Sequence, residues 1–295
     1  MNLKISLRVR WVKPTLERIV QDVQDLPALP QIVEQVIRVT EDPDSTVKEL
    51  NDIICQDQAL TARILRLANS AYYGFPRRIS TVVEAIVILG FNTIRNLVLA
   101  ASVYDLLSRE VPGYQLGKGE LWRHSIACAM AARLLARQVR FPAPDQAFVA
   151  GLLHDIGKIV LSVYMQDAYL EIINTVKEKR IPFSQAEKDV LGFTHAEVGA
   201  KVAEKWNFPV PLVEAIAFHH EPTRARENAR LTALVHIADA ICMMMGIGLG
   251  GDGLCYPVFP EALSLLGLQQ GIIEELIDRL SDLFVDKNSF LDATK

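Results

Sequence analysis

Apolar residues recur at intervals of three and four along most of this chain, a spacing that places side chains on one face of an α-helix. Ile32, Val36 and Val39 form one such set, and similar sets follow up to about residue 110. Spacers rich in glycine and proline interrupt the helical pattern, at 109–119, 140–144, 207–211 and 246–260. The pattern therefore predicts an all-α fold.

Half of the 295 residues are hydrophobic and 22% are charged, a balance that is typical of a globular protein and excludes wholesale disorder. The net charge of −4 argues against general electrostatic attraction to nucleic acid. The N-terminus lacks the pattern of a signal peptide, and the apolar runs are too short to cross a bilayer. We therefore expect a soluble, cytoplasmic protein that binds neither membranes nor generic DNA.

The cysteines are scattered without a C-x-x-C pair, which is typical of a protein from a reducing compartment. They are Cys55, Cys128, Cys242 and Cys255. Each is expected to be a buried thiol, and their spacing favours neither a zinc ribbon nor a redox pair.

Two further signals concern local structure. Residues 3–12 alternate apolar and polar side chains, the pattern of a half-buried strand, although a poorly packed extension explains them better because no partner strand follows. Thr46 with Glu49, and Thr81 with Glu84, have the spacing of the capping box, in which a hydroxyl and a carboxylate satisfy amides at a helix start.

The strongest chemical signal is the grouping of all six histidines between residues 124 and 236. His154 and Asp155 are the most informative, because the apolar residues before them should drive both side chains into the interior. Burying a carboxylate is costly unless a cation or several donors compensate. The pair therefore indicates either a position between two metal ions or a bend near a helix end; a buried histidine–aspartate hydrogen bond is the structural alternative.

Two further histidines lie near helix starts. Glu120 and His124 are four residues apart, so they project from one face of a predicted helix and can reach one ion, or they are an ordinary polar pair. His195 begins a helix that Thr194 and Glu197 cap, so its ring emerges at a helix N-terminus, where oxyanions also bind.

The remaining histidines lie in the last third of the chain. His219 and His220 end the helix that begins near Pro211, and Asp239 lies among apolar residues. His236, one turn before Asp239, either orients that carboxylate or, as we favour, lies on the helix surface. Imidazole with carboxylate suits iron, manganese, cobalt and zinc, and no thiolate is suitably paired for a structural zinc site. Two such ions would activate water and hold a phosphoryl group.

The order H…HD…H…HH…D resembles the HD superfamily of metal-dependent phosphohydrolases, with spacing most like its HD-GYP branch. The stretches LPALPQIVEQVI, IICQDQALTARILRLANSAYYG and ISTVVEAIVILGFNTIRNLVL are similar to the HDOD family of bacterial signal transduction. The resemblance covers roughly residues 17–240 and implies a helical N-terminal lobe packed on an HD-like lobe. The expected organisation is an extension at 1–12, an HDOD domain at 13–245 (a helical lobe at 13–110 and a metal-binding lobe at 111–245) and a connector with a helical extension at 246–295.

The resemblance also implies a metal site, because the chain retains ligand-like positions that HDOD proteins commonly lack. These positions are Glu120, His124, His154, Asp155, His195, His219, His220 and Asp239. They imply transition metal ions, two in number, with iron or manganese favoured and zinc, cobalt or nickel as alternatives. Glu120 matches the extra carboxylate of three-metal relatives. Lys158 either matches a lysine that approaches substrate phosphate in those relatives or is a solvated helix residue. If the protein is an enzyme, Lys158 and Asp155 would be its catalytic residues.

Two departures from the HD-GYP enzymes argue against activity on cyclic di-GMP. The sequence HHEPTRAR stands in place of their glycine-rich loop, and Cys242 stands where they often place a second aspartate. We therefore predict a bacterial regulatory protein with a metal site that binds a phosphorylated small molecule or a signalling protein partner. An active metal-dependent phosphohydrolase is the alternative, and a helical interaction scaffold without metal is a third possibility.

Overall fold

The computed structural model describes residues 30–70, 73, 75–250, 258–269 and 271–285, together with Ile19 and Gln21; for 163–167 and 283–285 only the backbone is described. Every regular element in these ranges is helical, apart from one isolated bridge between Val111 and Leu116. The predicted all-α fold is confirmed. The predicted strand at 3–12 lies outside the described residues.

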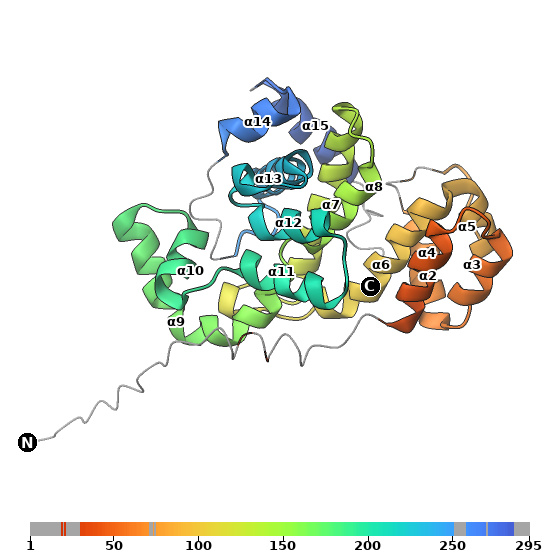
Figure 1. Cartoon of the computed structure of the whole chain (residues 1–295), viewed down its shortest axis with the longest axis horizontal. Helices are drawn as coiled ribbons and strands as arrows, with labels where there is room; N and C mark the ends of the chain where they lie inside the picture. The colour runs from red at the N-terminus through yellow and green to blue at the C-terminus, as the bar shows by residue number, and fades with distance from the viewer. Residues whose placement is uncertain are drawn as a thin grey trace, which may run out of the picture.

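Five helices form the N-terminal part of the fold, at one end of the molecule in Figure 1. They are α2 (Gln31–Glu41), α3 (Val47–Ile54), α4 (Gln58–Ala68), α5 (Val82–Leu89) and α6 (Phe91–Leu107). The long helix α6 packs against α2, α4 and α5, and also against the two helices that open the second part of the fold. It therefore joins the two halves of the core.

Of the two capping boxes predicted in this part, one is confirmed in full and the other only in part. Thr46 and Glu49 form the complete capping box. The Thr81 hydroxyl accepts the expected hydrogen bond from the Glu84 amide at 3.1 Å, but the Glu84 carboxylate accepts from the Ser80 amide, one residue earlier than predicted.

The second part of the fold consists of nine helices and two short 3-10 turns within the described residues. They are η1 (Pro112–Tyr114), α7 (Glu120–Gln138), α8 (Pro144–Leu153), α9 (Gly157–Lys179), α10 (Phe183–Leu191), α11 (His195–Lys205), α12 (Val210–Phe218), η2 (Pro222–Arg224), α13 (Ala229–Met244), α14 (Pro260–Leu266) and α15 (Ile272–Val285). Helix α7 packs against α8 and α13, and α11 packs against α9 and α12. Figure 1 shows α12 and α13 running through the middle of this arrangement.

Two glycines set how closely the central helices approach. A side chain at Gly151 of α8 would meet the Cys128 carbonyl of α7 at 2.8 Å, and one at Gly157 of α9 would overlap the His195 carbonyl of α11. Only glycine permits such backbone contact. Because these glycines flank the turn between α8 and α9, that turn packs closely against both α7 and α11.

The prediction that every cysteine is a buried thiol is partly corrected. Cys128 and Cys242 are buried as expected, but Cys55 is exposed, because it ends α3 and its thiol bonds to the Asn51 side chain on the helix surface. Cys255 lies outside the described residues.

No described helix is both long and apolar enough to span a membrane. The predicted domain boundaries stay predictions.

Candidate metal centre

Seven of the eight predicted ligands meet in one cluster where helices α7, α8, α11, α12 and α13 converge. They are His124 on α7, His154 and Asp155 in the turn after α8, His195 at the start of α11, His219 and His220 at the end of α12, and Asp239 on α13. All are buried except His220, which is half-buried. The bend predicted at His154 and Asp155 is confirmed, and so is the capping box of Thr194 and Glu197 before His195.

Asp155 lies at the centre of the cluster, with each carboxylate oxygen facing a different pair of histidines. Its Oδ2 is 3.5 Å from Nε2 of His124 and 3.3 Å from Nε2 of His154. Its Oδ1 is 3.3 Å from Nε2 of His195 and 3.8 Å from Nε2 of His219. One carboxylate thus separates two groups of imidazoles.

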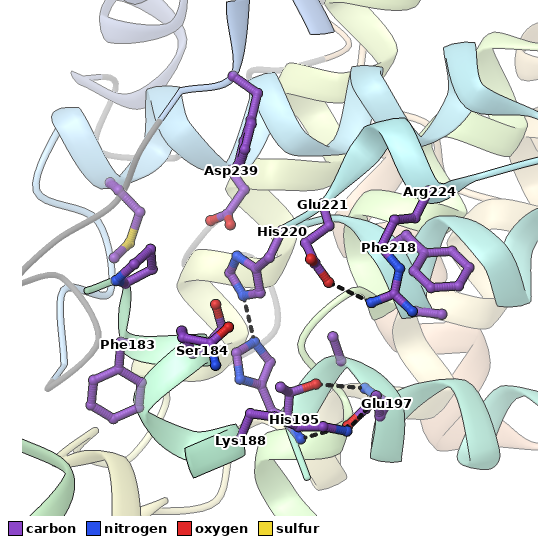
Figure 2. Close-up of a pocket in the computed structure, with 17 residues that line it drawn as sticks. Phe183, Ser184, Lys188, His195, Glu197, Phe218, His220, Glu221, Arg224 and Asp239 are labelled. Carbon is purple, nitrogen blue, oxygen red and sulfur yellow. Dashed lines mark hydrogen bonds and ion pairs between the residues drawn. The ribbon is translucent and has the colours of Figure 1, made fainter. Parts of the chain in front are cut away.

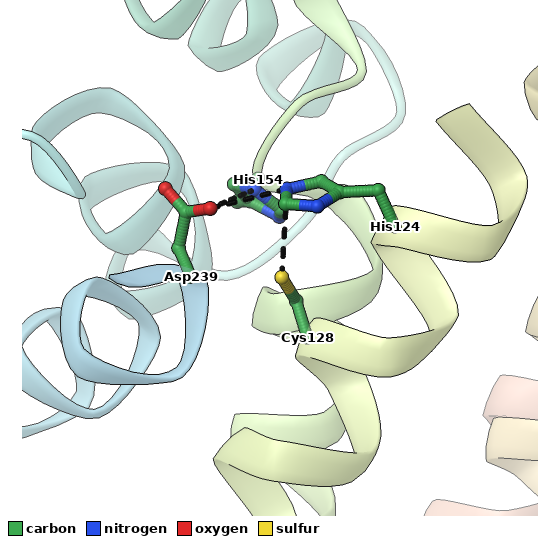
Figure 3. Close-up of side chains that lie close together, drawn as sticks. All are labelled: His124, Cys128, His154 and Asp239. Carbon is green, nitrogen blue, oxygen red and sulfur yellow. Dashed lines mark hydrogen bonds and ion pairs between the residues drawn. The ribbon is translucent and has the colours of Figure 1, made fainter. Parts of the chain in front are cut away.

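The first group lies between α7, α8 and α13 (Figure 3). Oδ1 of Asp239 is 3.1 Å from Nε2 of His124 and 3.7 Å from Nε2 of His154. The thiol of Cys128 completes this group, since its sulfur is 3.6 Å from Nε2 of His124. The four ligand atoms lie within 4.8 Å of one another, and we call this set the thiol half.

The second group consists of His195, His219 and His220, whose ligand atoms also lie within 4.8 Å of one another. Nε2 of His195 and Nε2 of His220 are 2.8 Å apart, so one ring donates a proton to the other unless a cation takes the place of that proton (Figure 2). We call this set the open half, because His195 and His220 line a cavity of about 330 Å³.

The ring orientation of two histidines is fixed by backbone carbonyls. Nδ1 of His154 lies 2.8 Å from the Gly151 carbonyl, and Nδ1 of His219 lies 2.8 Å from the Ile216 carbonyl. A carbonyl only accepts, so each Nδ1 must carry the proton. Nε2 of a neutral ring then presents a lone pair toward Asp155, as a metal-ligating histidine does.

The other two rings are anchored from different parts of the fold. Nδ1 of His124 donates to the Ile247 carbonyl at 2.9 Å, which ties the start of the connector to the cluster. Nδ1 of His195 donates to Oε2 of Glu187 at 2.8 Å, and the Tyr114 hydroxyl donates to Oε1 at 2.5 Å. A buried carboxylate behind a histidine is a common support for a metal ligand.

Three atoms of the cluster test whether a cation fits. Nε2 of His154, Nε2 of His219 and Oδ1 of Asp155 are buried and have no hydrogen-bond partner in the described part of the chain. Buried polar atoms are rarely left unsatisfied in native proteins. The three residues form a group whose ligand atoms lie within 4.8 Å of one another, so cations bound in the cluster would satisfy these atoms. The residues present therefore fit a metal.

The charges of the cluster are strongly coupled. Burial opposes ionisation of His154, but the charge of Asp155 outweighs it and raises the pKa of that ring to about 10. Burial likewise opposes ionisation of His195, while Glu187 raises its pKa to about 9. For His219, burial and the charges of these two rings lower the pKa to about 3. Burial also opposes ionisation of Asp155, yet His154 and Lys158 hold its pKa well below its usual range. The cluster thus favours anionic carboxylates balanced by positive charge.

Glu120 lies away from the cluster, whereas Lys158 lies within it. Glu120 is exposed at the first turn of α7, and its carboxylate accepts from the Gly117 amide at 2.5 Å, so the structure does not bring it into the cluster. Lys158 is 3% exposed, its Nζ is 2.6 Å from Oδ2 of Asp155, and it lies over the Tyr114 ring. The interpretation of Lys158 as a solvated lysine is therefore wrong.

The favoured interpretation of His236 is also wrong. Its side chain is fully buried, because α13 is enclosed by α7, α12 and α14. Nδ1 donates to the His219 carbonyl at 2.8 Å, and Nε2 accepts from the Phe259 amide at 3.1 Å. His236 thus links the backbone of the open half to the start of α14.

Sequence reasoning missed Cys128 and Glu187. Cys128 is four residues after His124 on α7, so helical spacing could have found it. Glu187 is on α10, eight residues before His195, and no pattern in the sequence pointed to it.

Comparison with known proteins places this arrangement in a family. The model of the HDOD domain matches residues 26–222, which is most of the chain. The chain belongs to the HDOD family. An HDOD protein of unknown function from Geobacter sulfurreducens has a similar structure, with a TM-score of 0.76, 27% identity and coverage of 95% of this chain and 99% of that one.

Other relatives of this HDOD protein carry different names. A Shewanella amazonensis protein provisionally named a phosphohydrolase is 27% identical, with a TM-score of 0.70 and coverage of 94% and 96% of the two chains. An uncharacterised Treponema pallidum protein is 28% identical over 211 residues, 70% of this chain and 40% of that protein. Ribonuclease Y of Thermus thermophilus is 32% identical over 119 residues, 40% of this chain and 16% of that enzyme. The chain therefore spans less than half the length of these two curated relatives.

Proposed function

We propose that this HDOD protein is a cytoplasmic regulatory protein of bacterial signal transduction that binds two transition metal ions and, beside them, a small phosphorylated ligand. The observation that carries the proposal is the common orientation of four buried imidazoles. Each of His124, His154, His195 and His219 has its Nδ1 held by a carbonyl or carboxylate and its Nε2 directed at a central carboxylate. This is the orientation that metal-ligating histidines adopt.

The donor set supports two cations, one on each side of Asp155. His124, His154 and Asp239 would hold one ion, and His195, His219 and His220 the other. Nitrogen and oxygen donors of this kind suit iron and manganese. When bound, such a pair of ions polarises a phosphoryl oxygen and lowers the pKa of water. A phosphorylated ligand would then complete the ligation from the cavity side.

The cavity beside the open half supports a small ligand. Its volume of about 330 Å³ is at the lower end of the range for small-molecule sites, which disfavours a cyclic dinucleotide. The lysine and the arginine of its lining are already paired, Lys188 with Glu197 at 2.6 Å and Arg224 with Glu221 at 2.7 Å (Figure 2). The metal ions would therefore supply most of the attraction for a phosphate group.

Hydrolysis of a small phosphoester is the second candidate function. The position of Asp155 between the two halves favours it, and the name of the Shewanella relative is consistent with it. Lys158 argues the other way, because its ammonium is buried against Asp155 and does not line the cavity. Regulation through ligand binding is therefore our first choice.

Metal content tests the proposal directly. Protein from medium supplemented with iron, manganese and zinc should contain close to two ions per chain by elemental analysis. Chelation should lower the thermal midpoint, because a ligand of the native state stabilises it. Asp155→Asn should lose most of the metal, whereas Asp105→Asn, an exposed aspartate in an ion pair with Arg63, should retain it. Metal-free wild-type protein whose midpoint ignores added metal would contradict the proposal.

Inorganic phosphate tests the ligand. It should bind to metal-loaded protein by calorimetry and should not bind to the chelated protein. Incubation of both forms with nucleoside monophosphates and cyclic di-GMP then separates the two candidate functions. Metal-dependent turnover that Asp155→Asn abolishes would favour the hydrolase, and binding without turnover would favour the regulator.

A further inference from the structure

The thiol half contains one sulfur donor, Cys128. Cys128 is fully buried on α7, one helical turn after His124, so both side chains project from the same face toward Asp239 (Figure 3). The other buried cysteine, Cys242 on α13, contacts the Cys128 thiol but lies outside the ligand group. The two thiols therefore have similar surroundings and different relations to the histidines.

Two separations around Nε2 of His124 are close to those expected around a small tetrahedral ion. Zinc binds sulfur at about 2.3 Å and imidazole nitrogen at about 2.0–2.1 Å, so two such ligands lie about 3.6 Å apart at a tetrahedral angle. The sulfur of Cys128 is 3.6 Å from Nε2 of His124. A nitrogen and an oxygen ligand of zinc lie about 3.3–3.4 Å apart by the same reasoning, and Oδ1 of Asp239 is 3.1 Å from that Nε2.

A second observation also points to a cation here. Nε2 of His154 is fully buried, has no hydrogen-bond partner in the described ranges, and points toward the same centre. A cysteine alone would be an ordinary buried thiol. With two imidazoles and a carboxylate converging on one point beside it, the thiol is one member of a four-donor set.

We propose that Cys128 is a metal ligand and that the thiol half, formed by His124, Cys128, His154 and Asp239, binds zinc. Thiolate is a soft donor that favours zinc over manganese, whereas carboxylate and imidazole alone discriminate less. The open half has no sulfur, and its three imidazoles together with the adjacent Oδ1 of Asp155 keep the nitrogen and oxygen chemistry expected for iron or manganese. The inference rests on the proposed function and deepens it, because it predicts two chemically different ions in one centre.

Binding of cobalt(II) gives the sharpest test, since a thiolate ligand produces a charge-transfer band in the near ultraviolet and the d–d bands report any cobalt bound. The experiment uses chelated full-length protein in which Cys55 and Cys255 are replaced by serine, so that neither adds a sulfur signal. This background is compared with its Cys128→Ser and Cys242→Ser derivatives. The far-ultraviolet circular dichroism of each protein checks that it is folded.

We expect the charge-transfer band in the background protein and in Cys242→Ser, and its loss in Cys128→Ser. The d–d bands should remain in Cys128→Ser, because the histidines and aspartates still bind cobalt. In competition experiments, Cys128→Ser should lower zinc affinity at least about tenfold and change manganese affinity by no more than about twofold.

The outcomes separate this inference from the proposed function. Stoichiometric cobalt with d–d bands and no charge-transfer band would overturn the role of Cys128 and leave the metal site intact; Asp155 would then be the fourth ligand. Loss of the charge-transfer band in Cys242→Ser alone would show that Cys242, and not Cys128, is the thiol ligand, and would overturn the proposal. No bound cobalt in any variant would contradict the proposed function itself.

Discussion

The substitution Glu187→Gln tests whether a buried carboxylate holds the open half in place. Glu187 is 0% exposed and accepts three hydrogen bonds, from the amide of His195 at 3.2 Å, from Nδ1 of His195 at 2.8 Å and from the hydroxyl of Tyr114 at 2.5 Å. Glutamine keeps the size and one acceptor oxygen. It removes the charge, however, and places an amide donor beside groups that also donate.

The expected loss follows from the strength of these bonds. A hydrogen bond to a charged group contributes about 1.5–3 kcal/mol, and a neutral one about 0.5–1.5 kcal/mol. Weakening three such bonds, with some relief because a buried charge is removed, should lower the free energy of unfolding by about 2 kcal/mol. Loss of support behind a metal-ligating histidine typically lowers metal affinity by about 10–100-fold, and we expect that range at the open half.

Urea unfolding of the chelated protein measures the first effect, and titration with manganese measures the second. Glu204→Gln is the matched control, because its carboxylate forms an ion pair with Lys201 at 2.8 Å in which both side chains are about half exposed. That change should cost less than about 1 kcal/mol. If Glu187→Gln has the same free energy of unfolding in urea and the same manganese affinity as Glu204→Gln, our account of Glu187 is refuted.

Three further substitutions test other contacts of the centre. Lys158→Met should lower the stability of the chelated protein, since it removes the buried partner of Asp155 at 2.6 Å, but metal should restore much of it; equal loss with and without metal would contradict this. Gly248→Ala should weaken binding at the thiol half, because φ is +69° and the added carbon would lie 2.6 Å from Cβ of His124; unchanged zinc affinity would count against it. Gly157→Ala should prevent folding, or lower the thermal midpoint by many degrees, because the methyl group would overlap the α11 backbone; a midpoint near that of wild type would refute this contact.

Much of the fold was predictable because helical periodicity is a local property. Residues such as Val36, Leu50 and Ile64 lie on the faces that the spacing predicts, and all three are buried. Capping was less predictable, because a carboxylate chooses among nearby amides. Glu84 bonds to the Ser80 amide, whereas Glu49 bonds to Thr46 as the pattern requires.

The position of His154 and Asp155 was predictable for a similar reason. An apolar stretch leads into them, so burial follows from the sequence, and burial of a carboxylate requires compensation. The surface interpretation of His236 failed because it treated one helix alone. Whether a side chain on α13 reaches solvent depends on which helices cover α13, and α14 covers this face.

Sequence by itself determined the all-α class, because helical periodicity is local, and its motifs indicated the family and, through that resemblance, the candidate ligands. Tertiary structure decided which donors share a cation position. Glu120 and His124 lie on one face of α7, yet four residues advance a helix by about 6 Å, which leaves the first at the exposed start of α7 and takes the second into the core. Cys128 advances one turn further and joins the cluster, and Glu187 arrives from α10. Spacing fixes direction around one helix axis, whereas the depth and crossing of neighbouring helices fix which atoms meet.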